Sequence, residues 1–252
     1  MSAAESGSKA KRKKRQFYSK FEKQRKTNEL KSGVKGFLCT CNMNEAECVR
    51  EAYNLLDEYY EKVYCKQELD SSVSHKLDCD LEKEIAGLKA KPRSFRQLFV
   101  NCRNVVFIEV NDEIDPISIA NCAFDEIERE KIAKTRFLLR FIPVSKTTKS
   151  DVKSIQECTK ELLQDQSNDS ISYMVVCKVR NNDNLSRSQL IEAVANVVKE
   201  QKPNWKVNFA NPSITINVDV IWKTTCLSFL NDFDKRRKYN IVEFSQKIIN
   251  EN

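Results

Sequence analysis

The sequence predicts a mixed α+β/α/β fold built from two successive units. Its 40% hydrophobic and 31% charged residues are the balance of an ordinary globular protein, and 252 residues are enough to bury two small cores. Segments in which apolar and polar residues alternate, as in strands, are interleaved with segments of helical periodicity. This succession stops at a polar, basic stretch at residues 145–149 and then begins again, which predicts the boundary between the units.

The positive charge of the chain is concentrated at its amino end. The net charge is +7, yet residues 1–31 hold eleven Lys or Arg against three Glu, so the rest of the chain carries about −1. The overall charge therefore gives no argument that the folded part binds nucleic acid. We expect residues 1–32 to form a disordered or partly helical basic arm that contacts nucleic acid, serves as a nuclear address, or only keeps the chain in solution. Its densest cations are Lys11, Arg12, Lys13, Lys14 and Arg15.

Several function classes lack the residues that they need. The ten cysteines include no CxxC pair, which predicts reduced thiols rather than disulfides or a zinc site. His75 is the single histidine and the four glycines form no nucleotide-binding loop, so we predict no catalytic residue, no metal and no cofactor. No run approaches the roughly 20 apolar residues of a membrane span, and residues 1–30 lack a signal-peptide core. We expect a chain of the cytosol or nucleus.

The first unit, residues 33–144, begins with a strand and a helix. Residues 36–42 read as a short strand, and Asn44 with Glu47 three positions later is a capping pair that starts a helix. The expected buried stripe of this helix is Val49, Ala52, Tyr53, Leu56 and Tyr60. Charged and serine-rich sequence at about 64–91 then predicts a variable insertion.

Two further strands, a helix and a last strand complete this unit. Residues 95–100 and 104–110 read as paired strands, Asp115 followed by Pro116 starts the second helix, and residues 135–144 form the fourth strand. The expected inward positions are Ile119, Ala120, Ala123, Phe124 and Ile127 of the helix and Phe137, Leu139 and Phe141 of the strand. The order strand, helix, strand, strand, helix, strand is the split βαβ arrangement of a ferredoxin-like domain.

The second unit, residues 145–240, reads as helix, strand, helix, strand, strand. Residues 145–149 are expected to be a linker, and Ser150 to cap a helix. The next strand ends near residue 180, and Ser186 with Gln189 forms a capping box for the second helix. The first helix is expected to present one face made of Val152, Ile155, Thr159 and Leu162. Residues 205–209 and 214–222 are expected to form the two strands that follow the second helix. Residues 241–252 read as a tail or short helix.

The junction at residues 171–189 collects groups that suit phosphate. Alternation of Ile171, Tyr173, Val175, Cys177 and Val179 toward a core sends Lys178 and Arg180 to the opposite face of the strand. The candidate RNA-binding residues here are Lys178, Arg180, Asn181, Asn182 and Arg187. They adjoin the free N–H groups of a helix amino end, which bind anions readily. An ordinary strand-to-helix turn with solvated charges is the alternative.

Six pieces of the chain, in order, carry a family resemblance. They are GFLCTCNMNE (36–45), NVVFIEV (104–110), TRFLLRFIPVSKTTK (135–149), KVRNN (178–182), VNFANPSITINVDV (207–220) and RKYN (237–240). With these pieces the chain resembles the THUMP-domain family, and within it the adaptors that serve the cytidine acetyltransferase acting on tRNA. The resemblance runs from about residue 36 to residue 239.

The resemblance implies both a fold and a function. It implies an N-terminal ferredoxin-like domain followed by a THUMP domain. It also implies a non-catalytic tRNA-binding adaptor, which presents serine and leucine tRNAs to a separate acetyl-CoA-dependent RNA cytidine acetyltransferase that makes N4-acetylcytidine in the D arm. Such an adaptor has no small-molecule substrate, and we expect it in the nucleus or nucleolus and also in the cytoplasm. A general RNA-binding or scaffold protein of ribosome biogenesis is the alternative.

Other cations are candidates because an adaptor grips folded RNA through phosphate contacts spread over a surface. Arg140, Lys146 and Lys149 lie beside the linker, and Lys206 lies near the last hairpin. Arg140 reads equally well as a solvent-facing sheet residue. The basic segment at residues 235–238 is either a solvated helix end or a further tRNA contact.

Overall fold

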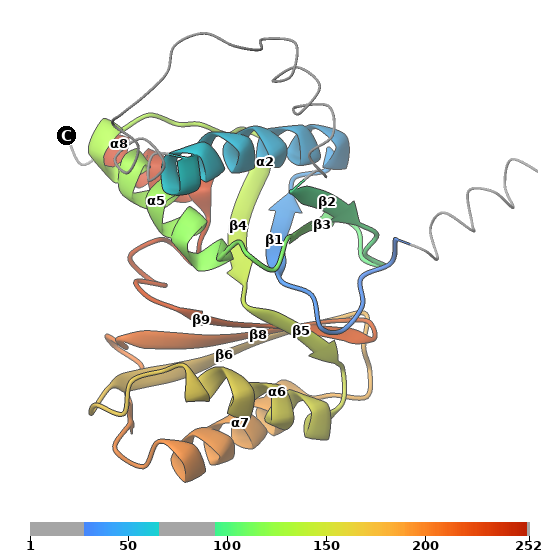
Figure 1. Ribbon diagram of the computed structural model, residues 1–252, viewed down its shortest axis with the longest axis vertical. Coiled ribbons are helices and arrows are strands. Elements are labelled where there is room, and N and C mark those ends of the chain that lie inside the picture. The colour runs from blue at the N-terminus through green and yellow to red at the C-terminus, as the bar shows by residue number, and fades with distance from the viewer. Residues whose placement is uncertain (1–27, 66–93, 251–252) are drawn as a thin grey trace, which may run out of the picture.

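The computed structural model describes residues 28–65 and 94–250, which form two helix-covered sheets (Figure 1). The helices of the first unit lie above its sheet in this view, and those of the second unit lie below the other sheet. The cluster Lys11–Arg15, His75 and most of the insertion predicted at 64–91 lie outside the described residues. None of the helices within the described ranges is long and apolar enough to cross a membrane.

The first sheet is antiparallel throughout and has the strand order β2-β3-β1-β4. Its strands are β1 (Gly36–Cys41), β2 (Phe95–Leu98), β3 (Val105–Val110) and β4 (Leu138–Val144). Helix α2 (Glu45–Tyr60), extended by the π-helical turn η1 (Glu61–Cys65), follows β1, and α5 (Pro116–Glu130) connects β3 to β4. The predicted order of strands and helices in this unit is confirmed.

Both predicted helix starts of the first unit are confirmed. The side chain of Asn44 accepts a hydrogen bond from the Glu47 N–H at 3.2 Å, and Asp115 caps α5 with Pro116 at the first helical position. The five predicted inward residues of α5 are fully buried. In α2 the buried face is rotated relative to the prediction: Cys48, Ala52, Leu55, Leu56 and Tyr59 are buried, whereas Val49, Tyr53 and Tyr60 are only partly covered.

The inward positions predicted for β4 are partly wrong because the strand contains a bulge. Pairing with β1 slips where Thr40 faces Arg140 while Cys41 faces Leu138, so Leu139 is an extra residue. A bulge of this kind reverses the alternation of side chains. Leu138 is therefore fully buried together with Phe141, whereas Phe137 and Leu139 are only partly buried.

The second sheet has the strand order β5-β9-β8-β6-β7. Its strands are β5 (Lys146–Lys149), β6 (Ser172–Arg180), β7 (Lys206–Val207), β8 (Ile214–Ile221) and β9 (Thr224–Leu230). Strand β6 runs parallel to β7 and β8, while β9 is antiparallel to β8 and β5. Helices α6 (Val152–Gln164) and α7 (Arg187–Gln201) cover one face of this sheet (Figure 1).

Four details of the second unit differ from the prediction, and the first is that β9 was not predicted as a strand. The expected linker at 145–149 contains edge strand β5, whose Thr147 is buried and donates through Oγ1 to the Lys31 carbonyl at 2.7 Å. Asp151, not Ser150, caps α6 by accepting from the Ser154 N–H. The strand predicted at 205–209 shortens to β7, because the Asn208 side chain accepts backbone N–H groups of the following turn.

The chain returns to the first unit after β9. Residues 231–240 and α8 (Ile241–Asn250) pack against α5 and β4, and their apolar side chains belong to the first core. The face of the second sheet that α6 and α7 leave uncovered meets the same core through Met174, Ile221, Cys226 and Leu230. The Ser228 hydroxyl donates to the Pro143 carbonyl at 2.6 Å across this contact. The two units therefore pack face to face.

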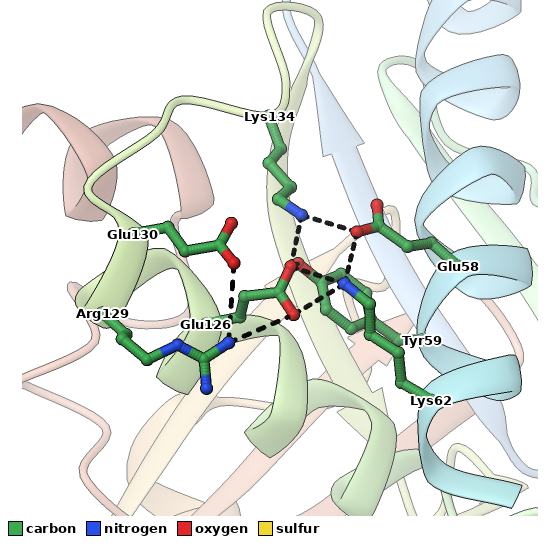
Figure 2. Close-up of polar contacts among 7 residues, drawn as sticks. All are labelled: Glu58, Tyr59, Lys62, Glu126, Arg129, Glu130 and Lys134. Atoms are coloured by element: carbon green, nitrogen blue, oxygen red, sulfur yellow. Dashed lines mark hydrogen bonds and ion pairs between the residues drawn. The ribbon is translucent and has the colours of Figure 1, made fainter. Parts of the chain in front are cut away.

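An ion-pair network around the buried Glu126 joins the helices of the first unit (Figure 2). The ammonium nitrogens of Lys62 and Lys134 lie 2.6 and 2.5 Å from the Glu126 carboxylate, which is only 7% exposed. Glu58 contacts both lysines, at 2.7 and 2.6 Å. Burial alone raises the pKa of Glu126, but hydrogen bonds from the two lysines outweigh burial and lower this pKa to about 2. The network holds the end of α2 against α5 and the loop before β4.

Candidate nucleic-acid interface

A cleft of about 390 Å³ separates the second sheet from β4 and the segment at 231–240. Its lining is Arg140, Ile142, Val176, Cys177, Lys178, Val179, Arg180, Arg187, Asn217, Asp219, Phe233 and Lys238. Five of these side chains are cations and one is a carboxylate, so the cleft carries an excess of four positive charges. Three of the five predicted junction residues and Arg140 meet here, although β4 and β6 are far apart in sequence.

The two faces of strand β6 pack against different cores, and the face toward the first unit continues into the cleft. Tyr173 and Cys177 are buried with the helices of the second unit, as the alternation predicts. Met174 and Val176 point the other way and pack on the first unit. Lys178 and Arg180 continue this second face beyond the packed region, where the cleft opens. The prediction that they lie opposite the second core is confirmed, and the surface that faces them is the first unit.

Arg180 is held in a buried ion pair. Its Nη1 lies 2.6 Å from Oδ1 of Asp219 on β8, and the two side chains are 12% and 3% exposed. The Asn217 amide donates to the other Asp219 oxygen at 2.9 Å. The pair fixes the guanidinium at the floor of the cleft. Sequence reasoning missed Asp219, although alternation along β8 signals it: Ile216 and Val218 face the second core, so the residues between and after them face the cleft.

Lys178 and Arg187 are the open cations of this wall. Both are exposed, and neither forms an ion pair with any residue in the described part of the chain. Desolvation by the cleft walls, followed by repulsion from Arg180, lowers the pKa of Lys178. Arg187 is the first residue of α7, where Ser186 caps the helix by accepting the Gln189 N–H at 3.2 Å. An anion in the cleft would relieve the repulsion between these cations.

The opposite wall comes from the first unit and from the segment after β9. Arg140 of β4 donates from Nη1 to the Lys238 carbonyl at 3.1 Å. The Lys238 side chain is exposed and lines the cleft. Arg140 is thus half-buried in a wall of the cleft, and the interpretation of it as a solvent-facing sheet residue is incomplete.

The two asparagines of the junction are engaged in shaping the turn. Asn181 has a left-handed backbone, with φ of 51°, and its amide donates to the Asn101 carbonyl of the β2–β3 loop at 2.8 Å. Asn182 donates to the Trp222 carbonyl at 2.7 Å and accepts from the N–H groups of Asn184 and Leu185. These bonds fix the turn at the end of β6. An RNA contact by either asparagine stays a prediction.

The other predicted cations lie away from the cleft. Lys146 is ion-paired with Glu161, and Lys149 is exposed at the end of β5, one edge of the sheet. Lys206 lies in β7 at the opposite edge, paired in register with Ser172 at the beginning of β6. The structure therefore separates Lys146, Lys149 and Lys206 from the junction cations, and their contact with RNA stays a prediction.

Comparison with known proteins shows which domain family the second unit resembles. Its residues 149–230 match the model of the THUMP domain. The chain carries a THUMP domain. It is 33% identical to THUMP domain-containing protein 1 of Bos taurus and 32% identical to that of Mus musculus, each over 230 residues and 85% of this chain. It spans 64% and 65% of those proteins, which is less than two thirds of their length. A solution structure of the THUMP domain of THUMP domain-containing protein 1 is 25% identical to this chain, with a TM-score of 0.29. The match covers 31% of this chain and 81% of the chain in that structure.

The extent of the THUMP match divides the cleft. Lys178, Arg180, Arg187 and Asp219 lie within residues 149–230, whereas Arg140 precedes the match and Lys238 follows it. The THUMP domain thus supplies one wall of the cleft, and the rest of the chain supplies the other.

Proposed function

We propose that this protein is a non-catalytic tRNA-binding adaptor and that the cleft holds the phosphate backbone of its RNA. The adaptor presents serine and leucine tRNAs to a separate acetyl-CoA-dependent RNA cytidine acetyltransferase, which forms N4-acetylcytidine in the D arm. The observation that supports RNA binding best is the excess of four positive charges in a cleft partly formed by a THUMP domain. The sequence resemblance to tRNA acetylation adaptors supports the finer role.

The chemistry of the cleft suits phosphate rather than a neutral ligand. Arg180 is fixed by Asp219 and accordingly offers its remaining N–H groups in a set direction, which favours hydrogen bonds to phosphate oxygens. Lys178 and Arg187 are exposed, and neither forms an ion pair with a carboxylate of the residues that the structure describes. Each of these side chains that neutralises a phosphate releases counterions from the RNA, which adds affinity and makes it depend on salt.

The proposal extends to the architecture and the location of the protein. The antiparallel order β2-β3-β1-β4, with α2 and α5 as connections, supports the assignment of the first unit as a ferredoxin-like domain. Chemistry on the tRNA then belongs to another chain, and the basic arm fits a nuclear or nucleolar protein that also occurs in the cytoplasm.

Two experiments test this function. Removing the protein from its cells should abolish N4-acetylcytidine in serine and leucine tRNAs, measured by mass spectrometry of the purified tRNAs; unchanged acetylation contradicts the adaptor role. Crosslinking followed by sequencing of the bound RNA should yield mainly these tRNAs. A predominance of ribosomal precursors favours instead a scaffold of ribosome biogenesis.

A further inference from the structure

The turn that carries Lys238 has an unusual backbone. Arg237, Lys238 and Tyr239 have φ values of 51°, 57° and 55°, so three successive residues with side chains adopt the left-handed conformation. This conformation is unfavourable for every residue that has a Cβ, and glycine is the residue that usually occupies it. Non-glycine residues persist there only where the surroundings enforce it, and such strain gathers at functional sites.

Buried side chains on both sides enforce this backbone. Arg236 is 6% exposed and donates to Asn121, to Asp125 at 2.9 Å and to the Tyr239 hydroxyl at 3.2 Å. Tyr239 is fully buried, and its hydroxyl donates to the Asn231 carbonyl at 3.1 Å. These anchors account for the residues that flank Lys238. Lys238 itself forms no ion pair within residues 28–65 and 94–250, so its side chain contributes nothing evident to holding the turn.

The turn places two groups of Lys238 at the cleft. Its N–H donates to the Phe233 carbonyl at 2.7 Å, and its own carbonyl accepts a hydrogen bond from Arg140 at 3.1 Å. Its ammonium group adds a fifth cation to a cleft whose single carboxylate is already paired with Arg180. Like charges repel, so an anion bound among these cations would stabilise their arrangement.

We propose that the left-handed turn at residues 237–239 is a phosphate-binding element of the cleft. It holds Lys238 and Arg140 opposite Lys178 and Arg187, so that an RNA backbone is gripped from both walls. Lys238 contacts phosphate directly, and its carbonyl positions the Arg140 guanidinium. This inference rests on the proposed function of the cleft in binding RNA.

Two substitutions at one position separate binding from folding. Lys238→Ala removes the cation and keeps a residue with a Cβ in the left-handed turn. Lys238→Gly removes the cation and also relieves the strain, so it should raise the melting temperature. We expect both full-length variants to bind tRNA more weakly than the wild type, with a salt slope reduced by about one. Lys235→Ala is the matched control, because Lys235 is an exposed cation that pairs with Glu128 outside the cleft.

The outcomes distinguish this inference from the proposed function. Higher stability of Lys238→Gly with weaker binding supports the inference. Unchanged tRNA affinity in both Lys238 variants overturns it, and the turn is then only a connector. If Lys178→Ala with Arg187→Ala weakens binding in that case, RNA binding by the cleft survives and only the role of the turn fails. If that double variant also binds normally, the proposed use of the cleft fails as well.

Discussion

Two clusters of charged side chains in this molecule differ in their balance. The network at the end of α2 sets Glu58 and Glu126 against Lys62 and Lys134, and every charge has a partner of opposite sign (Figure 2). The cleft between the units sets five cations against Asp219, which is already engaged by Arg180. The first cluster is complete without a ligand, whereas the second keeps an excess of four positive charges, which the phosphates of a bound RNA would balance under the proposed function. Charge balance, more than the number of Lys and Arg, separates a structural cluster from a candidate binding site.

The largest expected effect is a loss of fold stability when the ion pair between Arg180 and Asp219 is broken. This pair lies in the cleft, but its charges balance each other as those of the network do. Arg180→Ala leaves the Asp219 carboxylate buried without its partner, which should destabilise the fold by about 3–5 kcal/mol. Chemical denaturation measures this loss. The double variant Arg180→Ala with Asp219→Asn should recover part of the stability, because no charge is then left buried. Wild-type stability in Arg180→Ala shows that the pair contributes little.

The network of Figure 2 should make the stability of the fold depend on pH in the acidic range. The pKa of Glu126 falls from 4.5 to about 2 on folding, so the ionised form stabilises the fold above pH 4.5 and this contribution is lost as the pH falls toward 2. The shift corresponds to about 3 kcal/mol. Urea denaturation of the wild type and Glu126→Gln should show a difference that is constant above about pH 5 and shrinks below it. A difference that does not vary with pH contradicts the assignment.

A smaller effect concerns the protonation of Lys178. Its pKa is lowered by the cleft, and a bound phosphate should raise that pKa again, so the complex takes up protons at alkaline pH. The affinity for RNA should therefore fall as the pH approaches 10.5, the ordinary value for lysine. Titrations with 2′-O-methylated RNA, which resists alkaline cleavage, measure this dependence. Lys178→Arg, which stays charged, should reduce it, and an identical dependence in this variant argues against a contact by Lys178.

Local sequence signals predicted much of the fold. The caps at Asn44, Asp115 and Ser186 depend on residues within three positions of one another, and all three are present. The position of Leu138 was not predictable, because the bulge in β4 depends on its pairing with β1. Strand β5 was missed because its burial depends on a segment more than a hundred residues earlier in the chain, which bonds to Thr147.

The candidate site shows the same limit. Alternation along β6 predicted that Lys178 and Arg180 share a face, and that prediction is confirmed. The meeting of these side chains with Arg140 and Lys238 depends on how the two units pack, which no local pattern contains. In the sequence Lys146 and Lys206 look like candidates as good as Lys178. Lys146 is separated from the cleft by the order of the strands, and Lys206 by its register with Ser172 at the beginning of β6.

The most direct test compares the cleft with the sheet edges in the full-length protein. Lys178→Ala with Arg187→Ala removes the two exposed cations of the THUMP wall, and Lys146→Ala with Lys206→Ala removes two cations at the edges of the same sheet. The affinity for serine tRNA is measured by fluorescence anisotropy at several salt concentrations. We predict that the cleft variant loses about tenfold or more in affinity and that its salt slope falls by about two, while the edge variant stays close to the wild type. Equal losses in the two variants contradict the central claim that the cleft holds the RNA.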